Sequence, residues 1–241
     1  DRLGVKPLYY TKSNQEIIFS SEIKSILKID KSYAQLNKNA ISSYMSFRYP
    51  ILNDTFFQNI NSLPPAHYMK ISKFSKIETV EYWSLCNSFK EQENDQGEEY
   101  YLKKLKILLE SSVRYRLISD VPFGAFLSGG VDSSVITAIM SKNSKTSIKT
   151  YSVGFEEKSY NEFEYASLIA SKYKTDHHEI TVSGDDYMST MDELISYKDA
   201  PLSVPNEVPL NLMCKELKKD ITVVLSGEGA DEIFGGYGRI F

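Results

Sequence analysis

The sequence predicts an α/β protein whose larger part is an open parallel sheet covered by helices on both faces. From residue 98 onward, short apolar runs alternate with segments of helical spacing, and a parallel strand returns only through such a crossover. Two of the apolar runs end in a serine and a glycine, at Ser128 and Ser226. Residues 1–90 lack this alternation and predict a mixed piece in which strands dominate.

A change in charge balance near residue 91 predicts two structural units. Residues 1–90 carry 12 Lys and Arg against 7 Asp and Glu, whereas residues 91–241 carry 16 against 25, so a positive part precedes a negative part. The run EQENDQGEE at the boundary contains no apolar residue, which is typical of a linker or surface loop. We therefore expect a first unit at 1–90, a linker at 91–100 and a second unit at 101–241.

In the first unit, pairs of short apolar runs predict two hairpins, and helical spacing predicts one helix. LYY and IIFSS flank the polar turn SNQ, and HYMKIS is closely followed by IETVEYW. SEIKSILKI places its apolar residues at helical spacing behind a serine cap. The predicted strands are 8–10, 17–21, 67–72 and 77–83, and the predicted helix is 21–29.

In the second unit, four strands and five helices are predicted. Apolar runs such as PFGAFLS are short enough to indicate buried strands. The first helix carries Leu102, Leu105, Leu109 and Val113 on one face, and Asn161 is the predicted cap of the third helix. The predicted strands are 122–128, 149–155, 177–182 and 221–226, and the predicted helices are 98–117, 133–142, 161–174, 185–197 and 208–219.

Composition limits the class of protein. The 241 residues are 41% hydrophobic and 25% charged, as in ordinary globular domains. A net charge of −4 argues against nucleic-acid binding, and no apolar run approaches the ~18 residues of a membrane helix. Cys86 and Cys214 are too few for a disulfide framework and predict reduced thiols in a cytoplasmic protein. Because the chain begins with Asp1, we expect it to be a piece of a longer protein.

The segment FLSGGVDSS, residues 126–134, joins a predicted strand to a predicted helix through Gly129 and Gly130. Ligands bind beyond the carboxyl ends of parallel strands, where glycines let the backbone approach an anion and the N–H groups of a helix start point at it. Asp132 would repel a bare phosphate, so a carboxylate here predicts Mg²⁺ between the two. Taken alone, the segment is explained more simply by a glycine turn with aspartate or serine as a helix cap.

A second segment, VVLSGEGADEIFGGYGR at 223–239, repeats the pattern of apolar strand, serine, glycine and acidic residues. Glu228, Asp231 and Glu232 lie within five residues at this strand end, which alone would indicate a solvated acidic turn. Two serine–glycine strand ends in one parallel sheet, both carrying acids, are better explained by one nucleotide–Mg²⁺ site. Neither segment has the GxxxxGK[ST] pattern of a Walker A loop.

Four motifs together resemble one family. SGGVDSS resembles the pyrophosphate-binding loop of the N-type ATP pyrophosphatases, and LSGEGADEIFGGY is similar to the second signature of asparagine synthetases. DRLGVKPLYY with FSSEIKSIL, and then NINSLPPAHYMKI, resemble the last part of a class II glutaminase domain, although the family usually has glycine where Ala66 stands. The resemblance covers essentially the whole chain in the right order. The chain is therefore identified as a member of the glutamine-hydrolysing asparagine synthetase family.

The resemblance implies an adenine nucleotide alpha hydrolase-like sheet, preceded by an incomplete mixed α+β glutaminase-type piece. It implies a ligase of asparagine biosynthesis, in which ATP activates aspartate as β-aspartyl-AMP with release of pyrophosphate. Ammonia from glutamine then attacks the adenylate and gives asparagine and AMP. The implied partners are aspartate, glutamine, ATP and Mg²⁺, with no nucleic acid and no membrane, and a homodimer is left open.

The resemblance also implies the site residues. Glu228 would serve the formation of the adenylate and the handling of the amine, and Asp132 with Asp231 would hold Mg²⁺. The implied ATP contacts are Leu127 at the adenine, Ser128, Gly129, Gly130, Asp132 and Ser133 at the pyrophosphate part, Val153 at a second nucleotide contact, and Ser226 and Gly227 at a third.

Some of the family pattern is absent from the chain. The glutaminase of the family uses an N-terminal cysteine as nucleophile, whereas residue 1 is Asp1, and the later synthetase segment with its lysine is absent. We therefore expect the chain to be inactive alone. We interpret His177 and His178 as packed or surface imidazoles. The segment 199–211 resembles the stretch lining the aspartate pocket, although a rigid connecting loop explains its three prolines equally well.

Other functions stay open at this point. A related amidotransferase acting on another carboxylate, such as a β-lactam-forming or sugar-modifying enzyme, would carry the same ATP loops. A non-catalytic nucleotide-binding module would carry them too, although the recognisable site residues are intact. The wider pyrophosphatase group, such as GMP or argininosuccinate synthetases, is disfavoured by the glutaminase-like first 80 residues and by GEGADE.

Overall fold

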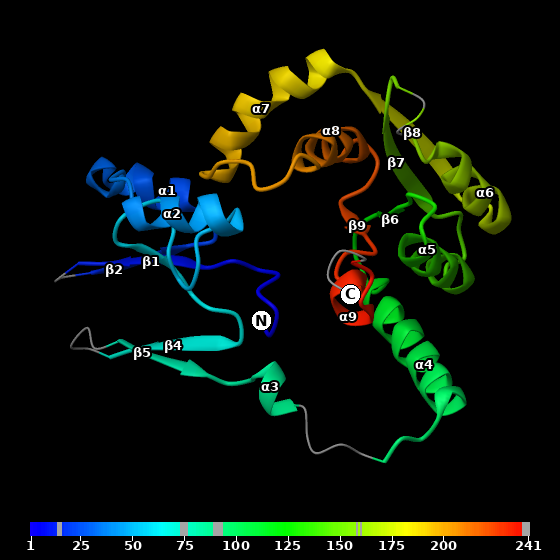
Figure 1. Cartoon of the computed structure of the whole chain (residues 1–241), viewed down its shortest axis with the longest axis horizontal. Helices are drawn as coiled ribbons and strands as arrows, with labels where there is room; N and C mark the ends of the chain where they lie inside the picture. Colours follow the sequence, from blue (N-terminus) through cyan, green and yellow to red (C-terminus); the bar gives the residue numbers. More distant parts are fainter. Residues whose placement is uncertain (14–15, 73–76, 89–93, 158, 160, 238–241) are drawn as a thin grey trace. The chain divides into compact units, whose positions relative to one another are not determined.

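Contacts along the chain define two compact units. The computed structural model describes residues 1–13, 16–72, 77–88, 94–157, 159 and 161–237 (Figure 1). A first unit comprises Asp1–Asp95 and Ile195–Val204, and a second unit comprises Gln96–Leu194 and Pro205–Phe241. Three parts of the predicted features lie outside the described residues: the turn at 14–15, the linker start at 91–93, and the end of the second serine–glycine segment at 238–239.

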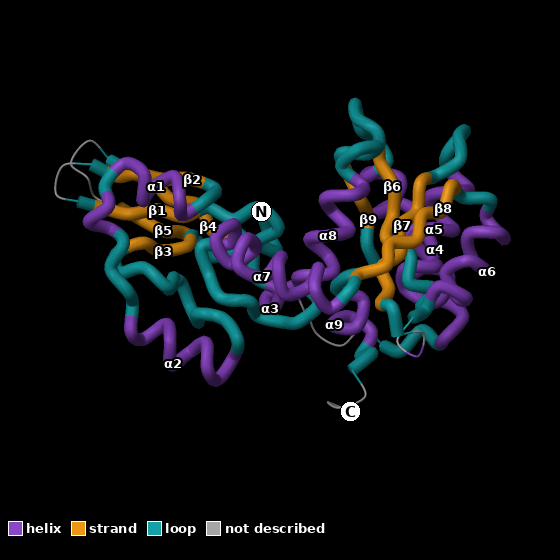
Figure 2. The backbone as a smooth tube through the Cα atoms, turned by 90° about the horizontal axis from the view of Figure 1, so that it is seen from above, coloured by secondary structure: helices purple, strands orange, loops and turns teal. Residues whose placement is uncertain are grey.

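The second unit is built on a four-stranded parallel sheet (Figure 2). Its strands are β6 (Phe123–Phe126), β7 (Lys149–Phe155), β8 (Asp176–Val182) and β9 (Val223–Leu225), in the order β8-β7-β6-β9. From β6 the chain moves outward through β7 to β8, and it then returns to place β9 on the other side of β6. The strand order therefore reverses between β6 and β9, which is where open α/β sheets bind ligands.

Helices cover both faces of this sheet, as the sequence predicts. On one face, Val113 and Met140 pack with Ala125 and Leu225. On the other face, Met213 packs with residues of β7 and β9. The helices are α4 (Glu98–Arg116), α5 (Val131–Asn143), α6 (Phe163–Tyr173), α7 (Gly184–Lys198, whose residues from Ile195 onward belong to the first unit), α8 (Glu207–Leu217) and α9 (Ala230–Phe234), of which α4, α5 and α6 lie on the first face and α8 on the second.

Side chains at residues 125–127, at the end of β6 and just after it, point alternately to the two faces of the sheet. Both faces are covered, which explains why all three residues are apolar. Ala125 packs with α4 and α5, and Leu127 packs with Ala166 and Ala170 of α6. Phe126, between them, packs on the opposite face with the cluster around α8. Successive side chains of a strand point to opposite faces, so a strand covered on both sides needs apolar residues at every position.

The first unit is a mixture of small antiparallel sheets and helices. Ile23, Ile26 and Ile60 form its core, with Tyr9 and Ile18 packed against them. Both predicted hairpins are confirmed, whereas β3 and α2 are not predicted from the sequence. The elements are β1 (Tyr9–Lys12), β2 (Ile17–Ser20) and β3 (Ile60–Ser62) in the order β2-β1-β3, the ribbon β4 (His67–Ile71) with β5 (Ile77–Glu81), α1 (Ile23–Ile29), the 3-10 turn η1 (Lys31–Tyr33), α2 (Lys38–Phe47) and α3 (Leu85–Ser88).

Two helix details differ from the prediction. Helix α1 has Glu22 as its N-cap residue without a side-chain cap, and the hydroxyl of Ser20 instead accepts a hydrogen bond from the Glu22 N–H at 3.2 Å. In α4, Leu102 is 57% exposed, whereas Val113 is buried. The predicted apolar face of α4 therefore packs against the sheet only near the C-terminal end of the helix.

Among the described residues, no helix combines the length and the apolar character that crossing a membrane requires.

Gly129 is predicted to be a position where only glycine is tolerated. Its φ is +87°, and a Cβ there would lie 2.4 Å from the Cβ of Tyr165 and 2.6 Å from the backbone nitrogen of Ala166. Because left-handed backbone costs roughly 1–2 kcal/mol in other residues and overpacking adds about 1–3 kcal/mol, Gly129→Ala should lower the free energy of unfolding by at least ~2 kcal/mol. Thermal melting followed by circular dichroism measures this loss.

The matched control is Gly184→Ala, because a Cβ at Gly184 meets nothing within 4 Å and this residue opens α7. Alanine is the better helix former, so the control should melt at or slightly above the temperature of the unchanged chain. Equal melting temperatures for the two variants would contradict the tight packing of the first loop against α6.

Candidate active site

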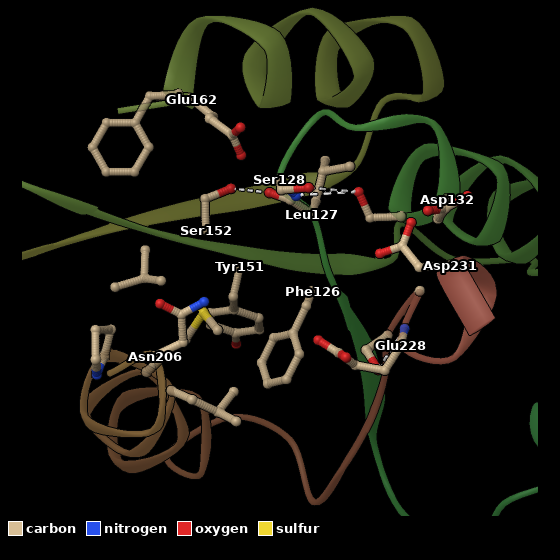
Figure 3. Close-up of a pocket in the computed structure, with 18 of the residues that line it drawn as sticks. Phe126, Leu127, Ser128, Asp132, Tyr151, Ser152, Glu162, Asn206, Glu228 and Asp231 are labelled. Atoms are coloured by element: carbon tan, nitrogen blue, oxygen red, sulfur yellow. Dashed lines mark hydrogen bonds between the residues drawn. The ribbon is translucent and has the colours of Figure 1, made fainter. Parts of the chain in front are cut away.

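A pocket of about 450 Å³ lies in the second unit at the carboxyl ends of β6, β7 and β9 (Figure 3). Its wall is made by the ends of these strands, the loops after β6 and β9, and the start of α8. The lining residues are Phe126, Leu127, Ser128, Asp132, Ser133, Tyr151, Ser152, Val153, Phe155, Glu162, Phe163, Asn206, Pro209, Leu210, Met213, Ser226, Gly227, Glu228, Gly229 and Asp231. The structure thus brings the two predicted serine–glycine loops to one site.

The first loop, residues 127–133, is held by its own hydroxyl groups. The Ser128 hydroxyl accepts a hydrogen bond from the Gly130 N–H at 3.3 Å and lies 3.0 Å from the Ser133 hydroxyl. The Ser133 hydroxyl also donates to the Gly130 carbonyl at 3.3 Å. Gly129 and Gly130 form the turn itself and do not line the pocket. These bonds fix the path of the backbone next to the pocket.

The start of α5 has N–H groups available for an anion. Gly130 is the N-cap residue, and no side chain caps the helix. The structure therefore contradicts the simpler explanation of the segment, in which an aspartate or serine side chain caps the helix. The first turn of a helix carries N–H groups without intrahelical partners, and Asp132 and Ser133 of this turn both line the pocket.

The second loop, residues 226–229, packs directly against the start of α5. A Cβ on Gly227 would lie 2.9 Å from the Cβ of Asp132 and 2.9 Å from the backbone nitrogen of Ser133. Glycine at 227 therefore permits a close approach between the two loops. The Ser226 hydroxyl accepts from the Glu228 N–H at 3.4 Å, which places Glu228 at the pocket.

Four carboxylates line the pocket: Glu162 at the start of α6, and three from the two serine–glycine loops and the helices that follow them. Asp132 comes from the first turn of α5, Glu228 from the second loop and Asp231 from the first turn of α9 (Figure 3). Glu232 does not line the pocket, because its carboxylate accepts a hydrogen bond from Tyr237 at 2.7 Å, which lowers the pKa of Glu232. The pocket therefore gathers negative charge that a bound cation would offset.

The donor set fits a magnesium ion that arrives with a substrate. No group of three or more His, Cys, Asp or Glu able to hold a metal occurs in the part of the chain that the structure describes. Mg²⁺ is commonly held by one or two carboxylates together with substrate phosphates, and Asp132 and Asp231 supply two carboxylates at the same pocket. A cation bound here would need its remaining oxygen ligands from the ligand and from water.

The rest of the wall is largely apolar and suits a flat ring. Phe126, Val153, Phe155 and Met213 contribute side chains of this kind. Leu127 is fully buried, and its side chain is committed to the contact with α6, so it contributes a fixed position rather than a mobile side chain.

Tyr151 also lines the pocket, but its hydroxyl bonds Asp220, which is not a lining residue. Burial and the nearby Asp220 raise the pKa of Tyr151 to about 12, so its hydroxyl remains a donor to Asp220, at 3.3 Å.

Three polar pocket residues are missed by reasoning from the sequence. Ser152 lies within β7, Glu162 is the N-cap residue of α6, and Asn206 precedes α8. Asn206 belongs to the proline-rich segment 199–211, so the resemblance of that segment to a pocket-lining stretch is the signal that could have found it. No pattern in the sequence marks Ser152 or Glu162.

Asn161 is wrongly predicted as the cap of α6. Glu162 occupies the N-cap position, and Asn161 instead bonds the end of β7. Its amide oxygen accepts from the Phe155 N–H at 2.5 Å and its amide nitrogen donates to the Phe155 carbonyl at 2.7 Å. Gly154 allows this contact, since a Cβ there would lie 2.5 Å from the Asn161 oxygen. Asn161 thus fixes the pocket wall at Phe155.

The chain is similar to known proteins over both units. Residues 104–241 match the asparagine synthase family, and residues 1–83 match the glutamine amidotransferase domain. Two Bacillus subtilis proteins, glutamine-hydrolysing asparagine synthetases 1 and 3, are 35% and 34% identical over 98% of this chain, which covers 37% and 40% of their lengths. An amidase of Gibberella zeae is 28% identical over 98% of this chain and 37% of its own length. The chain spans less than half of each of these relatives.

Loss of the Asn161 amide is expected to destabilise the second unit. Asn161→Ala leaves the N–H and carbonyl of Phe155 without these partners, and unsatisfied, partly buried groups cost about 1–3 kcal/mol each. Thermal melting of the purified chain measures the loss. Asn143→Ala is the matched control, because this exposed amide donates to the Ile139 carbonyl of its own helix at 2.8 Å. An equal loss in both variants would contradict the role assigned to Asn161.

Proposed function

This chain belongs to the asparagine synthase family, and we propose that the whole protein is a glutamine-hydrolysing asparagine synthetase of the cytoplasm. Glutamine and water give glutamate and ammonia. Aspartate and ATP give β-aspartyl-AMP and pyrophosphate, and ammonia then displaces AMP to give asparagine. One observation carries the proposal: two serine–glycine loops, with the carboxylates of Asp132, Glu228 and Asp231, meet in one pocket at the point where the strand order reverses.

The residues of the pocket suit the proposed roles. Ser128, Ser133 and the free N–H groups at the start of α5 would bind the pyrophosphate part of ATP. Asp132 and Asp231 would hold Mg²⁺, which when bound neutralises charge on the leaving pyrophosphate. Glu228 would accept a proton from the attacking amine. The remaining proposed ATP contacts are Leu127, Gly129, Gly130, Val153, Ser226 and Gly227, of which the two glycines at 129 and 130 would act through the shape of the turn.

The proposal covers both parts of the chain. Residues 1–90 would be the C-terminal part of a class II glutamine amidotransferase domain, and residues 101–241 the N-terminal part of the synthetase domain. The match of residues 1–83 to the glutamine amidotransferase domain supports the first assignment. Among the described residues, Cys86 and Cys214 are free thiols, which supports a reducing compartment.

A second candidate is a related amidotransferase that uses another carboxylate as acceptor. The similarity to a fungal amidase supports it, because that relative matches 98% of this chain under a different name. The ATP loops would be the same in both enzymes, and only the acceptor pocket would differ. Assaying the whole protein with aspartate and with other carboxylic acids separates the two candidates.

Two variants of the whole protein test the roles of the pocket carboxylates. Asp132→Ala should lower affinity for Mg²⁺·ATP and the aspartate-dependent exchange of labelled pyrophosphate into ATP. Glu228→Gln should lower the exchange and the ammonia-dependent synthesis while ATP still binds. We expect losses in rate of roughly 10²–10⁴-fold, the range for removed electrostatic or proton-transfer groups.

The matched control for these variants is Glu164→Gln, which changes a glutamate of α6 outside the pocket lining. Its exchange rate should equal that of the unchanged protein. If Asp132→Ala synthesised asparagine from ammonia at the unchanged rate, the role assigned to Asp132 would be refuted. If the unchanged protein bound Mg²⁺·ATP but catalysed neither the exchange nor the synthesis, a non-catalytic nucleotide-binding module would replace the proposal.

The chain 1–241 alone is expected to be inactive. It covers 37% of a related asparagine synthetase, so the proposed glutaminase nucleophile and the later part of the synthetase domain would lie outside it. The purified chain should release neither pyrophosphate from ATP plus aspartate nor glutamate from glutamine, whereas the whole protein should release both. Appreciable release of either product by the chain would refute this expectation.

A further inference from the structure

A largely buried imidazole lies behind the first loop and has no part in the function proposed above. His177 is on β8, and its side chain is only 10% exposed. Its Nδ1 lies 2.9 Å from the Thr150 hydroxyl and its Nε2 lies 3.5 Å from the Ser152 hydroxyl. The Ser152 hydroxyl in turn donates a hydrogen bond to the carbonyl of Leu127, the residue directly before Ser128 (Figure 3).

The directions of these hydrogen bonds select one form of the imidazole. Ser152 gives its single hydroxyl proton to the Leu127 carbonyl, so toward His177 it can only accept. Nε2 therefore carries the proton, and Nδ1 accepts from the Thr150 hydroxyl. Thr150 then accepts from the Thr175 hydroxyl, which lies at 2.8 Å. The neutral imidazole with the proton on Nε2 satisfies every member of this chain of bonds.

We propose that His177 is a positioning residue for the first loop: it orients Ser152, whose hydroxyl holds the Leu127 carbonyl at the root of the ATP-binding loop. The inference rests on the proposed function, because it assigns His177 to the site proposed to bind ATP. His177 does not line the pocket, so it acts through Ser152, which does.

The hydrogen bond from Ser152 to the Leu127 carbonyl lies where the β6–β7 pairing ends, so it positions the start of the first loop. The pairing of β6 with β7 ends at Phe126 and Tyr151, and the Leu127 N–H still donates to the Tyr151 carbonyl at 2.9 Å. The Leu127 carbonyl is bonded by the Ser152 side chain and not by a backbone group of the ladder. This last anchor before Ser128 therefore depends on a hydroxyl that could rotate, and the imidazole limits that rotation.

The surroundings of His177 favour its neutral form. Burial lowers the pKa of His177, and this effect outweighs the opposing effect of Glu179, whose carboxylate lies 3.8 Å from Nε2. Glu179 is also engaged by the Ser167 hydroxyl at 2.9 Å. A protonated ring would donate from both nitrogens, so the Thr150 hydroxyl could no longer donate to Nδ1.

The test uses the whole protein with His177→Phe, Ser152→Ala, the double variant and His177→Gln. Affinity for Mg²⁺·ATP is measured by calorimetry, and KM for ATP and for aspartate by pyrophosphate exchange. His177→Phe and Ser152→Ala should each weaken ATP binding about tenfold, the effect of one lost hydrogen bond at a site, with KM for aspartate unchanged. The double variant should be no weaker than either single variant, because both remove the same link.

Two comparisons separate positioning from general destabilisation. His177→Gln keeps an amide N–H for Ser152 and should recover most of the affinity that His177→Phe loses. His178→Phe changes the neighbouring residue of β8, which stacks on Tyr151 at 5.0 Å, and keeps a ring there. It should bind ATP as the unchanged protein does. Thermal melting of each variant identifies any that fails to fold. If His177→Phe fails to fold, the ATP affinities of Ser152→Ala and His177→Gln test the positioning role instead.

Unchanged ATP affinity in both His177→Phe and Ser152→Ala would overturn the inference, as would equal losses in the phenylalanine and glutamine variants. If the unchanged protein bound ATP but showed no aspartate-dependent exchange, the proposed function would be refuted, and the ATP affinities of the variants would still test the role of His177. If the unchanged protein did not bind Mg²⁺·ATP, the proposed function and the inference about His177 would both be refuted.

Discussion

The close approach of two loops is the constraint on which the site depends. Gly227 lies against the start of α5 with no room for a Cβ beside Asp132, so the loops after β6 and β9 share one wall. This approach requires β9 to pair with β6, which the parallel register from Phe123↔Val223 to Ala125↔Leu225 provides. The paired residues are 100 positions apart in the chain, and only the reversal of strand order makes the strand ends neighbours.

The first loop is anchored from three directions. Its own hydroxyls bond across the turn, Gly129 fits against α6 where a Cβ would clash, and Ser152 holds the Leu127 carbonyl from β7. Each anchor uses a different physical means: local hydrogen bonds, close packing, and a side chain that extends the ladder. Preorganisation of this kind lets backbone N–H groups bind an anion without rearrangement.

Much of this could be predicted from the sequence, and the failures have physical causes. Short continuous apolar runs and helical spacing predict the elements of the parallel sheet, because a strand covered on both faces needs apolar residues at every position. Helix α2 is not among the predicted elements, although Ala40, Ile41, Tyr44 and Met45 recur at helical spacing, so its signal is present in the sequence. Asn161 could cap a helix or bond a neighbouring strand, and the choice is made by Gly154, a contact invisible in local sequence. His177 had no local signal, since its partners come from β7 as well as β8.

The carboxylates of the pocket indicate that a nucleotide would enter it together with a cation. Asp132, Glu228 and Asp231 face the same space, and phosphate oxygens brought among them alone would be repelled. Under the proposed function the cation therefore arrives with the triphosphate, because the described protein groups do not complete a metal site by themselves. The same logic applies to release: pyrophosphate would leave together with its cation, because without the cation it would be repelled by the carboxylates.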